Sequence, residues 1–249
     1  MDNTERRGIL IRISAFFLIV GLGITGCIEP NPGLNFASKE APEAGFPSAI
    51  QLAQGGEELD LRTAQSIRRY GHIIQKYAHA YQVDWRLILA VMRQESSFRP
   101  RVVSYKGAYG LMQIMPLTSA ELTQKIGVKN TLTPYNNIKA GIYHLRSLHR
   151  YFDDAKGDER IKLTLAAYNA GLNRIRDAQD VARYMGDDPN SWAAVKDALP
   201  MLSKRYKTLH SRIWRSGTPG SGYFRDSRQT TRYVENIMSY YDGYQLALR

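Results

Sequence analysis

The chain reads DWRLILAVMRQE over residues 84–95 and GAYGLMQIMP over residues 107–116. Asp84 is a residue type that often caps the start of a helix, and the residues after it are apolar almost all round. This pattern predicts a buried helix rather than a surface helix. Glu95 ends the helix, four residues after Val91 and eight after Leu87, so its carboxylate should project from the apolar face.

The predicted surroundings of Glu95 disfavour the charged form of its carboxyl group. Partial burial and the negative end of the helix dipole both raise the pKa of such a group. A glutamic acid that stays protonated near neutral pH can donate a proton to a leaving oxygen, the step that breaks a glycosidic bond. The alternative is an ordinary solvated glutamate at a frayed helix end, because perturbed carboxylates also occur at purely structural positions.

The segment after this helix carries two glycines, which allow positive φ angles or a close approach of the backbone. Several polar groups could then face a ligand. They are Ser104, Gln113 and the backbone around Leu111 and Met112. Together with the preceding acid, these groups predict a cleft of the size of a sugar.

Five blocks of sequence carry a resemblance to a known family. In chain order they are Glu95-Ser96-Ser97-Phe98, Ser104 with residues 107–116, Asn137-Ile138 with Gly141, Ala167-Tyr168-Asn169-Ala170-Gly171, and Tyr233-Val234-Glu235-Asn236-Ile237. They resemble the catalytic domain of the soluble lytic transglycosylases, relatives of goose-type lysozyme that cleave the glycan of bacterial peptidoglycan. The segment over residues 187–203 looks most like the F-type membrane-bound members. The resemblance spans roughly residues 67–241.

The resemblance implies a reaction that uses one glutamate and no metal or other cofactor. Glu95 would protonate the oxygen between N-acetylmuramic acid and N-acetylglucosamine, with help from the acetamido group, and its carboxylate would then deprotonate the sugar's own 6-hydroxyl. The product would be a 1,6-anhydromuramic end. Ser104 should orient Glu95 or the acetamido group. The residues expected to bind the glycan or to line the cleft are Gly110, Leu111, Met112, Gln113, Tyr168, Asn169, Ala170 and Tyr233.

Two other functions stay open. A lysozyme-type hydrolase usually needs a second carboxylate. Asp84 and Glu121 are expected at a helix cap and on a polar face, where structural or solvated roles fit them better. If the enzyme is a hydrolase, its second acid should be sought first near Asp226 and Glu235. A non-catalytic peptidoglycan-binding lipoprotein is less favoured because Glu95 is intact. Product chemistry separates the hydrolase from the transglycosylase, and turnover separates the binding protein from both enzymes.

The first 26 residues are typical of a secretion signal. Arginines precede an apolar run over residues 13–23. This run is too short and too rich in glycine to be a typical membrane-spanning helix. Its end, Ile24-Thr25-Gly26-Cys27, resembles a bacterial lipobox. This resemblance implies a lipid anchor on Cys27, and Ile28 after it favours the outer membrane. The alternative is an unmodified thiol in a cleaved signal or an uncleaved anchor.

Residues 27–60 differ in composition from the rest of the chain. Prolines and glycines with scattered polar residues leave little to bury, which predicts a flexible tether before a catalytic domain over residues 61–249. F-type transglycosylases are expected to carry a solute-binding-like domain before the catalytic one. This chain has no room for it.

The periodicity of the remaining residues is helical. Ile67, Tyr70, Ile74 and Tyr77 form one apolar stripe, residues 138–148 contain another, and strand-like alternation is hard to find. We therefore predict an all-α, lysozyme-like domain with minor irregular or β content. A final helix is expected over about residues 231–241, after an irregular stretch near residues 217–228.

The formal net charge of +11 predicts an acidic partner, although it also fits a plain solubility role. Stem peptides of peptidoglycan, anionic envelope polymers and an anionic lipid surface would serve. Nucleic acid is not expected, because Lys and Arg are spread along the chain and no known nucleic-acid module is visible. No metal site is expected either, since the histidines lack the spacing of metal ligands. His144 and His149 are expected on a helix surface.

Overall fold

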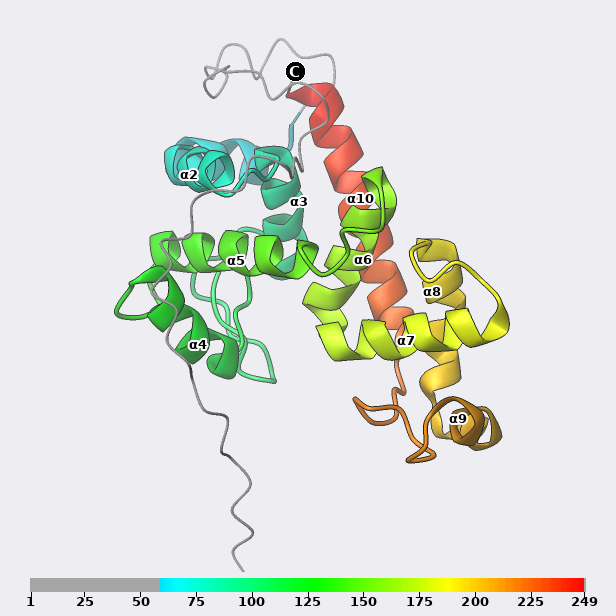
Figure 1. The fold of residues 1–249 in the computed structure, drawn as a ribbon. Helices are drawn as coiled ribbons and strands as arrows, with labels where there is room; N and C mark the ends of the chain where they lie inside the picture. The colour runs from blue at the N-terminus through cyan, green and yellow to red at the C-terminus, as the bar shows by residue number, and fades with distance from the viewer. Residues whose placement is uncertain (1–58, 249) are drawn as a thin grey trace, which may run out of the picture. The chain divides into compact units, whose positions relative to one another are not determined.

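The computed structural model describes residues 59–248 (Figure 1). Its α-helices are α2 (Leu61–Ala80), α3 (Trp85–Ser96), α4 (Pro116–Ile126), α5 (Pro134–His149), α6 (Gly157–Ala170), α7 (Leu172–Met185), α8 (Trp192–Ala198), α9 (Lys207–Ile213) and α10 (Ser227–Ala247). Two short 3₁₀ helices, η1 (Leu199–Leu202) and η2 (Lys204–Tyr206), join α8 to α9. These residues contain no β-strand, only isolated bridges from Tyr109 to Val103 and Ile114. The predicted all-α class is confirmed.

The predictions for the signal peptide, for Cys27 and for nearly all of the tether lie outside the described residues. Within residues 59–248, no helix is both long enough and apolar enough to span a membrane.

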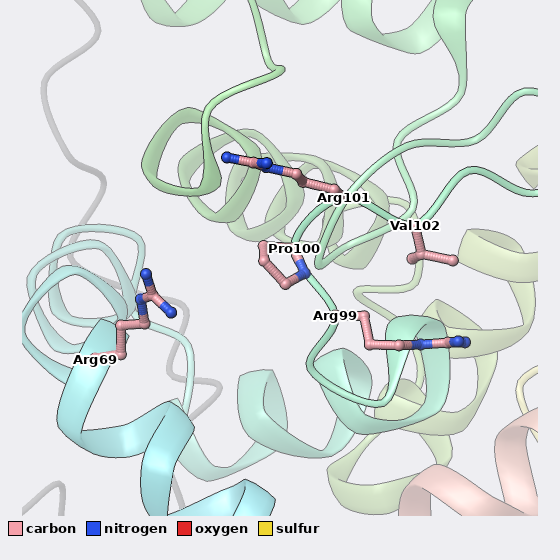
Figure 2. Close-up of a pocket in the computed structure, with 5 residues that line it drawn as sticks. All are labelled: Arg69, Arg99, Pro100, Arg101 and Val102. Carbon is pink, nitrogen blue, oxygen red and sulfur yellow. The ribbon is translucent and has the colours of Figure 1, made fainter.

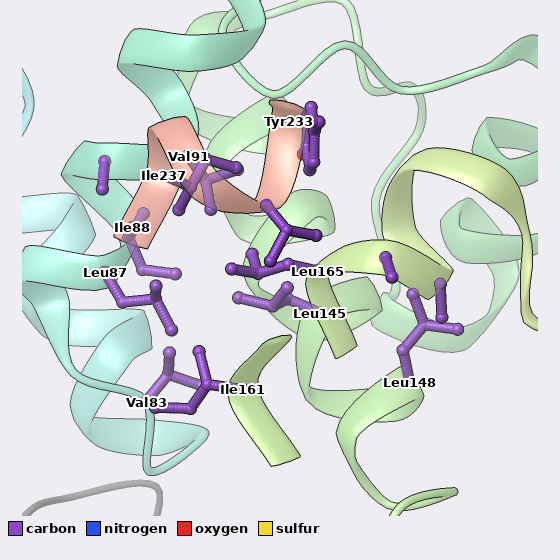
Figure 3. Close-up of a cluster of buried hydrophobic side chains, with 14 of the residues drawn as sticks. Val83, Leu87, Ile88, Val91, Leu145, Leu148, Ile161, Leu165, Tyr233 and Ile237 are labelled. Atoms are coloured by element: carbon purple, nitrogen blue, oxygen red, sulfur yellow. The ribbon is translucent and has the colours of Figure 1, made fainter. Parts of the chain in front are cut away.

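Helix α3 is the centre of the apolar core. Asp84 caps it by accepting a hydrogen bond from the Arg86 amide at 2.9 Å, and every residue from Leu87 to Met92 is buried. Helices α10 and α2 both pack against α3. Figure 3 shows Leu87, Ile88 and Val91 gathered with side chains of α5, α6 and α10. The all-round apolar pattern of residues 85–92 therefore corresponds to burial on several sides, as the sequence predicts.

The end of α3 is sharp. Ser97 follows the last helical residue with φ +48°, in the left-handed region, and Phe98 follows with φ +62°. Such angles are uncommon for residues other than glycine, so two in succession mark a turn that the surrounding structure holds in place. The turn leaves Glu95 one residue before the end of the helix.

The last helix is longer than the predicted span of residues 231–241. It begins at Ser227, where the Asp226 carboxylate accepts a hydrogen bond from the Gln229 amide at 3.3 Å, and runs to Ala247. Near its end, the buried Tyr244 hydroxyl lies 2.9 Å from the Thr63 hydroxyl of α2. This tertiary contact stabilises the helical turns beyond residue 241, where the predicted helix ended. The irregular stretch before the helix is present over residues 217–226.

The prediction that His144 and His149 lie on a helix surface is wrong. His149 is only 2% exposed, and His144 is partly buried. Helix α5 packs against α2, α4 and α6 and so has contacts on several sides, which its own sequence does not reveal. Burial lowers the pKa of His149 to about 2 and that of His144 to about 4.

Candidate active site

Glu95 and Tyr233 form the centre of the candidate site. The Tyr233 hydroxyl, on α10, donates a hydrogen bond to Glu95 Oε1 at 2.6 Å. Tyr233 is 5% exposed, and Glu95 is partly buried. The bond joins the end of α3 to the first half of α10 (Figure 3 shows Tyr233 beside the apolar cluster).

Burial raises the pKa of Glu95 to about 7, and the hydrogen bond from Tyr233 acts in the opposite direction. A carboxyl group with such a pKa exists in both protonation states near neutral pH, as a residue that acts first as acid and then as base requires. The raised pKa was predicted from the sequence, although the hydrogen bond that limits it was not. The pKa of Tyr233 is also raised, by burial and by the nearby carboxylate.

Asn137, in the first turn of α5, organises the glycine-containing segment. Its Oδ1 accepts a hydrogen bond from the Met112 amide at 2.8 Å, and its Nδ2 donates to the Tyr109 and Thr131 carbonyls at 2.9 and 3.2 Å. Asn137 is fully buried. A Cβ atom on Gly110 would lie 2.7 Å from the Asn137 side chain, and Gly110 has φ +82°, so both space and backbone conformation require glycine there.

Leu111 and Met112 are fully buried, so their side chains belong to the core. The Ser96 hydroxyl donates to the Leu111 carbonyl at 3.0 Å, and the Tyr168 hydroxyl donates to the Met112 carbonyl at 2.8 Å. A Cβ on Gly141 would lie 2.6 Å from the Met112 side chain, so α5 and this segment are in close contact. These contacts tie α3, α5 and α6 to the segment after Glu95. A part for Leu111 and Met112 in glycan binding stays a prediction.

Ser104 and Gln113 make their hydrogen bonds within the same segment. Ser104 Oγ accepts from the Ala108 amide at 3.0 Å, and Gln113 Nε2 donates to the Gly110 and Val102 carbonyls at 2.9 and 3.1 Å. The structure shows no hydrogen bond from Ser104 to Glu95 in the part of the chain that it describes. The predicted orienting role of Ser104 therefore stays a prediction.

A polar pocket of about 550 Å³ lies beside Tyr233. Eight residues of α3, α6, α10 and the turn before α10 line it: Gln94, Asn169, Asp226, Arg228, Gln229, Arg232, Tyr233 and Asn236. Asn169 is held by the Thr230 hydroxyl, which donates to its Oδ1 at 2.9 Å, and Asn236 donates to Gln94 Oε1 at 3.2 Å. The structure thus brings two predicted site residues, Asn169 and Tyr233, into one pocket. Ala170 is not among the lining residues, and its carbonyl accepts from Arg174 at 2.9 Å.

Sequence reasoning missed the two arginines and the glutamines of this pocket. A signal for them existed, because residues 228, 232 and 236 follow one another at intervals of four and share a helix face with 229 and 233. The late start assumed for the last helix left residues 228 and 229 outside it. Of the two candidate second acids, Asp226 lines the pocket, whereas exposed Glu235 lies 4.0 Å from Lys196.

A second hollow, of about 520 Å³, is lined by Arg69, Arg99, Pro100, Arg101 and Val102 (Figure 2). In Figure 2 the Arg99 side chain points away from Arg69, and its Nε donates to the Ser96 carbonyl at 3.1 Å. None of the predicted site residues lines this hollow. Residues 59–248 also contain no group of three or more His, Cys, Asp or Glu side chains placed to hold a metal ion.

The domain is all-α and of the lysozyme-like class, with a partly buried acid near the end of α3 and a polar pocket beside the tyrosine bonded to that acid. Residues 72–190 match the family described as Transglycosylase SLT domain. An X-ray structure of an inactive Glu-to-Gln mutant of the lytic transglycosylase Slt from Pseudomonas aeruginosa is similar, with a TM-score of 0.52 and 27% identity. The similarity covers 80% of this chain and 28% of that one.

Two curated proteins named as lytic transglycosylases are similar to this chain in sequence. The membrane-bound lytic murein transglycosylase F of Desulfosudis oleivorans is 37% identical over 175 residues, which are 70% of this chain and 36% of that protein. The protein of that name from Pseudomonas putida is 36% identical over 201 residues, 80% of this chain and 37% of its own length. The chain thus spans little more than a third of the length of these relatives.

Proposed function

We propose that this protein is a peptidoglycan lytic transglycosylase that cleaves the β-1,4 bond between N-acetylmuramic acid and N-acetylglucosamine. The observation that carries the proposal is the Glu95 carboxyl group, which has a pKa of about 7 and accepts a hydrogen bond from Tyr233 beside a polar pocket. The match of residues 72–190 to the SLT domain and the names of the relatives support it.

In the first step, protonated Glu95 gives its proton to the glycosidic oxygen. The bond between that oxygen and C1 of the muramic acid breaks, and the N-acetylglucosamine leaves as an alcohol. The electron pair of the bond goes to the leaving oxygen, so positive charge develops at C1. The acetamido group of the muramic acid stabilises this charge. Burial favours the acid form of Glu95, because few water molecules solvate its carboxylate.

In the second step, the Glu95 carboxylate takes the proton from the 6-hydroxyl of the muramic acid, whose oxygen bonds to C1. The product is a 1,6-anhydro ring, no water is consumed, and Glu95 regains its proton. An attacking group on the same sugar has a large effective concentration compared with free water. One carboxyl group is therefore sufficient for both steps.

Tyr233 is proposed to hold the Glu95 carboxyl group in one orientation through both steps. Its hydroxyl donates to Oε1 at 2.6 Å and can do so to either protonation state. The bond stabilises the carboxylate that forms after the first proton transfer, which keeps the pKa of Glu95 from rising further.

The glycan is proposed to lie along the pocket beside Tyr233 and the segment after α3. Asn169 would donate to sugar hydroxyl or acetamido oxygens from its place in the pocket. Gln113 and the backbone of Gly110, in the segment after α3, would bind the glycan from the other side. Ser104 belongs to the same segment. Tyr168 supports this arrangement indirectly, since its hydroxyl is bonded to the Met112 carbonyl.

The proposal is tested by the products released from purified peptidoglycan. We expect muropeptides that end in 1,6-anhydromuramic acid, each lighter by one water than the hydrolysis product and unchanged by borohydride. Mass spectrometry before and after reduction distinguishes the two kinds of end. A predominance of reducible muramic ends would contradict the transglycosylase mechanism.

A lysozyme-type hydrolase is the second candidate function, and the position of Asp226 is the observation in its favour. Asp226 lines the pocket that contains Tyr233, so a second carboxylate lies in the pocket whose tyrosine bonds to Glu95. Asp226→Asn keeps a good helix cap while removing the charge. A transglycosylase should retain most of its turnover in this variant, whereas a hydrolase that positions water through Asp226 should lose it. Absence of turnover in the parent protein would leave only a peptidoglycan-binding role.

We further propose a location in the cell envelope, with a lipid anchor on Cys27 that holds the protein at the periplasmic face of the outer membrane. The lipobox-like sequence before Cys27 supports the anchor, and relatives named as membrane-bound support the location. Metabolic palmitate labelling of the parent and of Cys27→Ala tests it. An unlabelled parent protein would contradict the anchor.

A further inference from the structure

Arg228 and Arg232 lie one turn apart on α10, and both line the pocket beside Tyr233. Both are exposed. Among residues 59–248, neither guanidinium group forms an ion pair with a carboxylate. Two like charges at this spacing repel each other, so the pair does not stabilise the helix. Their placement on one pocket instead suits the binding of an anion.

The other groups of the pocket differ in kind from the arginines. Gln94, Asn169, Gln229 and Asn236 carry amides, which suit the hydroxyl and acetamido groups of an uncharged sugar. Asp226 is the one carboxylate among the lining residues, and it accepts the amide hydrogen of Gln229 at the start of α10. With two arginines and one aspartate, the lining residues carry a net charge of 2 − 1 = +1. The uncharged hydroxyl and acetamido groups of the sugars make no use of this positive charge.

Arginine binds carboxylates, like phosphates, in a planar, paired geometry. The peptide stems of peptidoglycan carry free carboxylates and branch from the muramic acid at which cleavage is proposed. Tyr233 lines the arginine pocket and also bonds to Glu95, so the pocket lies within one side chain of the proposed acid. A volume of about 550 Å³ is adequate for part of a peptide.

We infer that Arg228 and Arg232 bind carboxylates of the peptide stem, so that the enzyme favours substrates whose stems carry free carboxylates. This inference rests on the proposed function, because the ligand is the substrate of that reaction. The arginines select the substrate and take no part in the proton transfers. Exposed charges are screened by salt, so the selection weakens as ionic strength rises.

Binding is measured with Glu95→Gln protein, which cannot consume its ligand. The probes are N-acetylglucosaminyl-N-acetylmuramyl tetrapeptide and the same compound with its peptide carboxyl groups converted to amides. We expect calorimetry to show about tenfold tighter binding of the free acid, equivalent to about 1.4 kcal/mol. Adding Arg228→Gln and Arg232→Gln should abolish this preference and leave the affinity for the amide unchanged. Both sites are exposed and glutamine is a good helix former, so the fold should be retained.

The matched control is Arg62→Gln with Arg68→Gln, again in the Glu95→Gln protein. Both arginines are exposed on α2 and lie outside the pocket, and the control removes the same net charge. It should keep the preference for the free acid. If the control also loses the preference for the free acid, that preference comes from the overall charge of the protein. This result would overturn the carboxylate site at Arg228 and Arg232.

Activity assays separate this inference from the proposed function. Equal binding of acid and amide, or a preference that survives in the double arginine variant, overturns the arginine site even if the parent protein releases anhydromuropeptides. Absence of turnover by the parent on any peptidoglycan overturns the proposed function. In that case an arginine-dependent preference in the binding assay would still establish the pocket as a carboxylate site.

Discussion

Replacement of Glu95 by Gln should stabilise the protein while it abolishes activity. The carboxyl group of Glu95 has a pKa of about 7 in the folded protein, against 4.5 for an ordinary glutamate, because burial disfavours its charge. Folding therefore costs free energy whenever this group is ionised in the unfolded chain. Glutamine is neutral at every pH and can still accept the hydrogen bond from Tyr233, so it avoids this cost.

The size and the pH dependence of the effect follow from the two pKa values. A difference of about 2.5, at 1.36 kcal/mol for each pKa unit, amounts to about 3 kcal/mol. Since the folded pKa is the higher one, proton binding favours the folded parent protein fully below pH 4.5. This contribution is lost as the pH rises towards 7. The advantage of Glu95→Gln should thus be smallest below pH 4.5, grow between the two values and stay constant above pH 7.

The assay is urea unfolding of the parent and Glu95→Gln at a series of pH values from 4 to 9. Glu121→Gln is the matched control. Glu121 is exposed on α4 and its pKa is lowered by Lys125, so that variant should not become more stable as the pH rises. Lytic turnover on isolated sacculi should fall at least about 10²-fold in Glu95→Gln. A stability difference independent of pH would refute the argument from burial, and near-parental turnover would remove Glu95 from catalysis.

Three more substitutions, the last with a matched control variant, test the surroundings of the acid and the segment after it. Tyr233→Phe removes the bond that lowers the pKa of Glu95, so the alkaline limb of the pH profile of kcat/KM should move to higher pH and activity should fall; an unmoved limb contradicts this. Asn137→Ala should lower the free energy of unfolding by about 2–4 kcal/mol in urea, because three backbone groups, two of them in buried hydrogen bonds, each lose a partner. Gly141→Ala should cost about 1–3 kcal/mol through overpacking, whereas Gly243→Ala, with open space around it, should not destabilise the protein. Equal effects of the two glycine variants would refute the close contact.

The fold class and the central helix were predictable from the sequence because their signals are local. Asp84, the apolar run after it and Glu95 place α3 within a residue of its observed bounds. The end of α10 was not predictable in this way. Its last turns depend on a contact between Tyr244 and Thr63, which lie 181 residues apart in the chain. Burial of His149 likewise depends on three other helices, so the pattern of α5 alone could not reveal it.

For the site, the sequence singled out Glu95, and the family blocks pointed to Tyr233 and Asn169. The direct bond between Tyr233 and Glu95 spans 138 positions of the chain, and its existence depends on how α3 and α10 pack. The roles expected of Ser104 and Gln113 remain predictions, since their hydrogen bonds are to their own segment.

The sequence by itself determined that the domain is helical and that an acid ends an apolar helix, because helix periodicity and capping depend on neighbouring residues. Only the tertiary structure decided which groups surround that acid. Desolvation, hydrogen bonding and pocket formation depend on distances between elements, which no local pattern contains. The raised pKa of Glu95, the bond from Tyr233 and the convergence of Arg228 and Arg232 on one pocket arise for this reason from the packing of α3, α6 and α10.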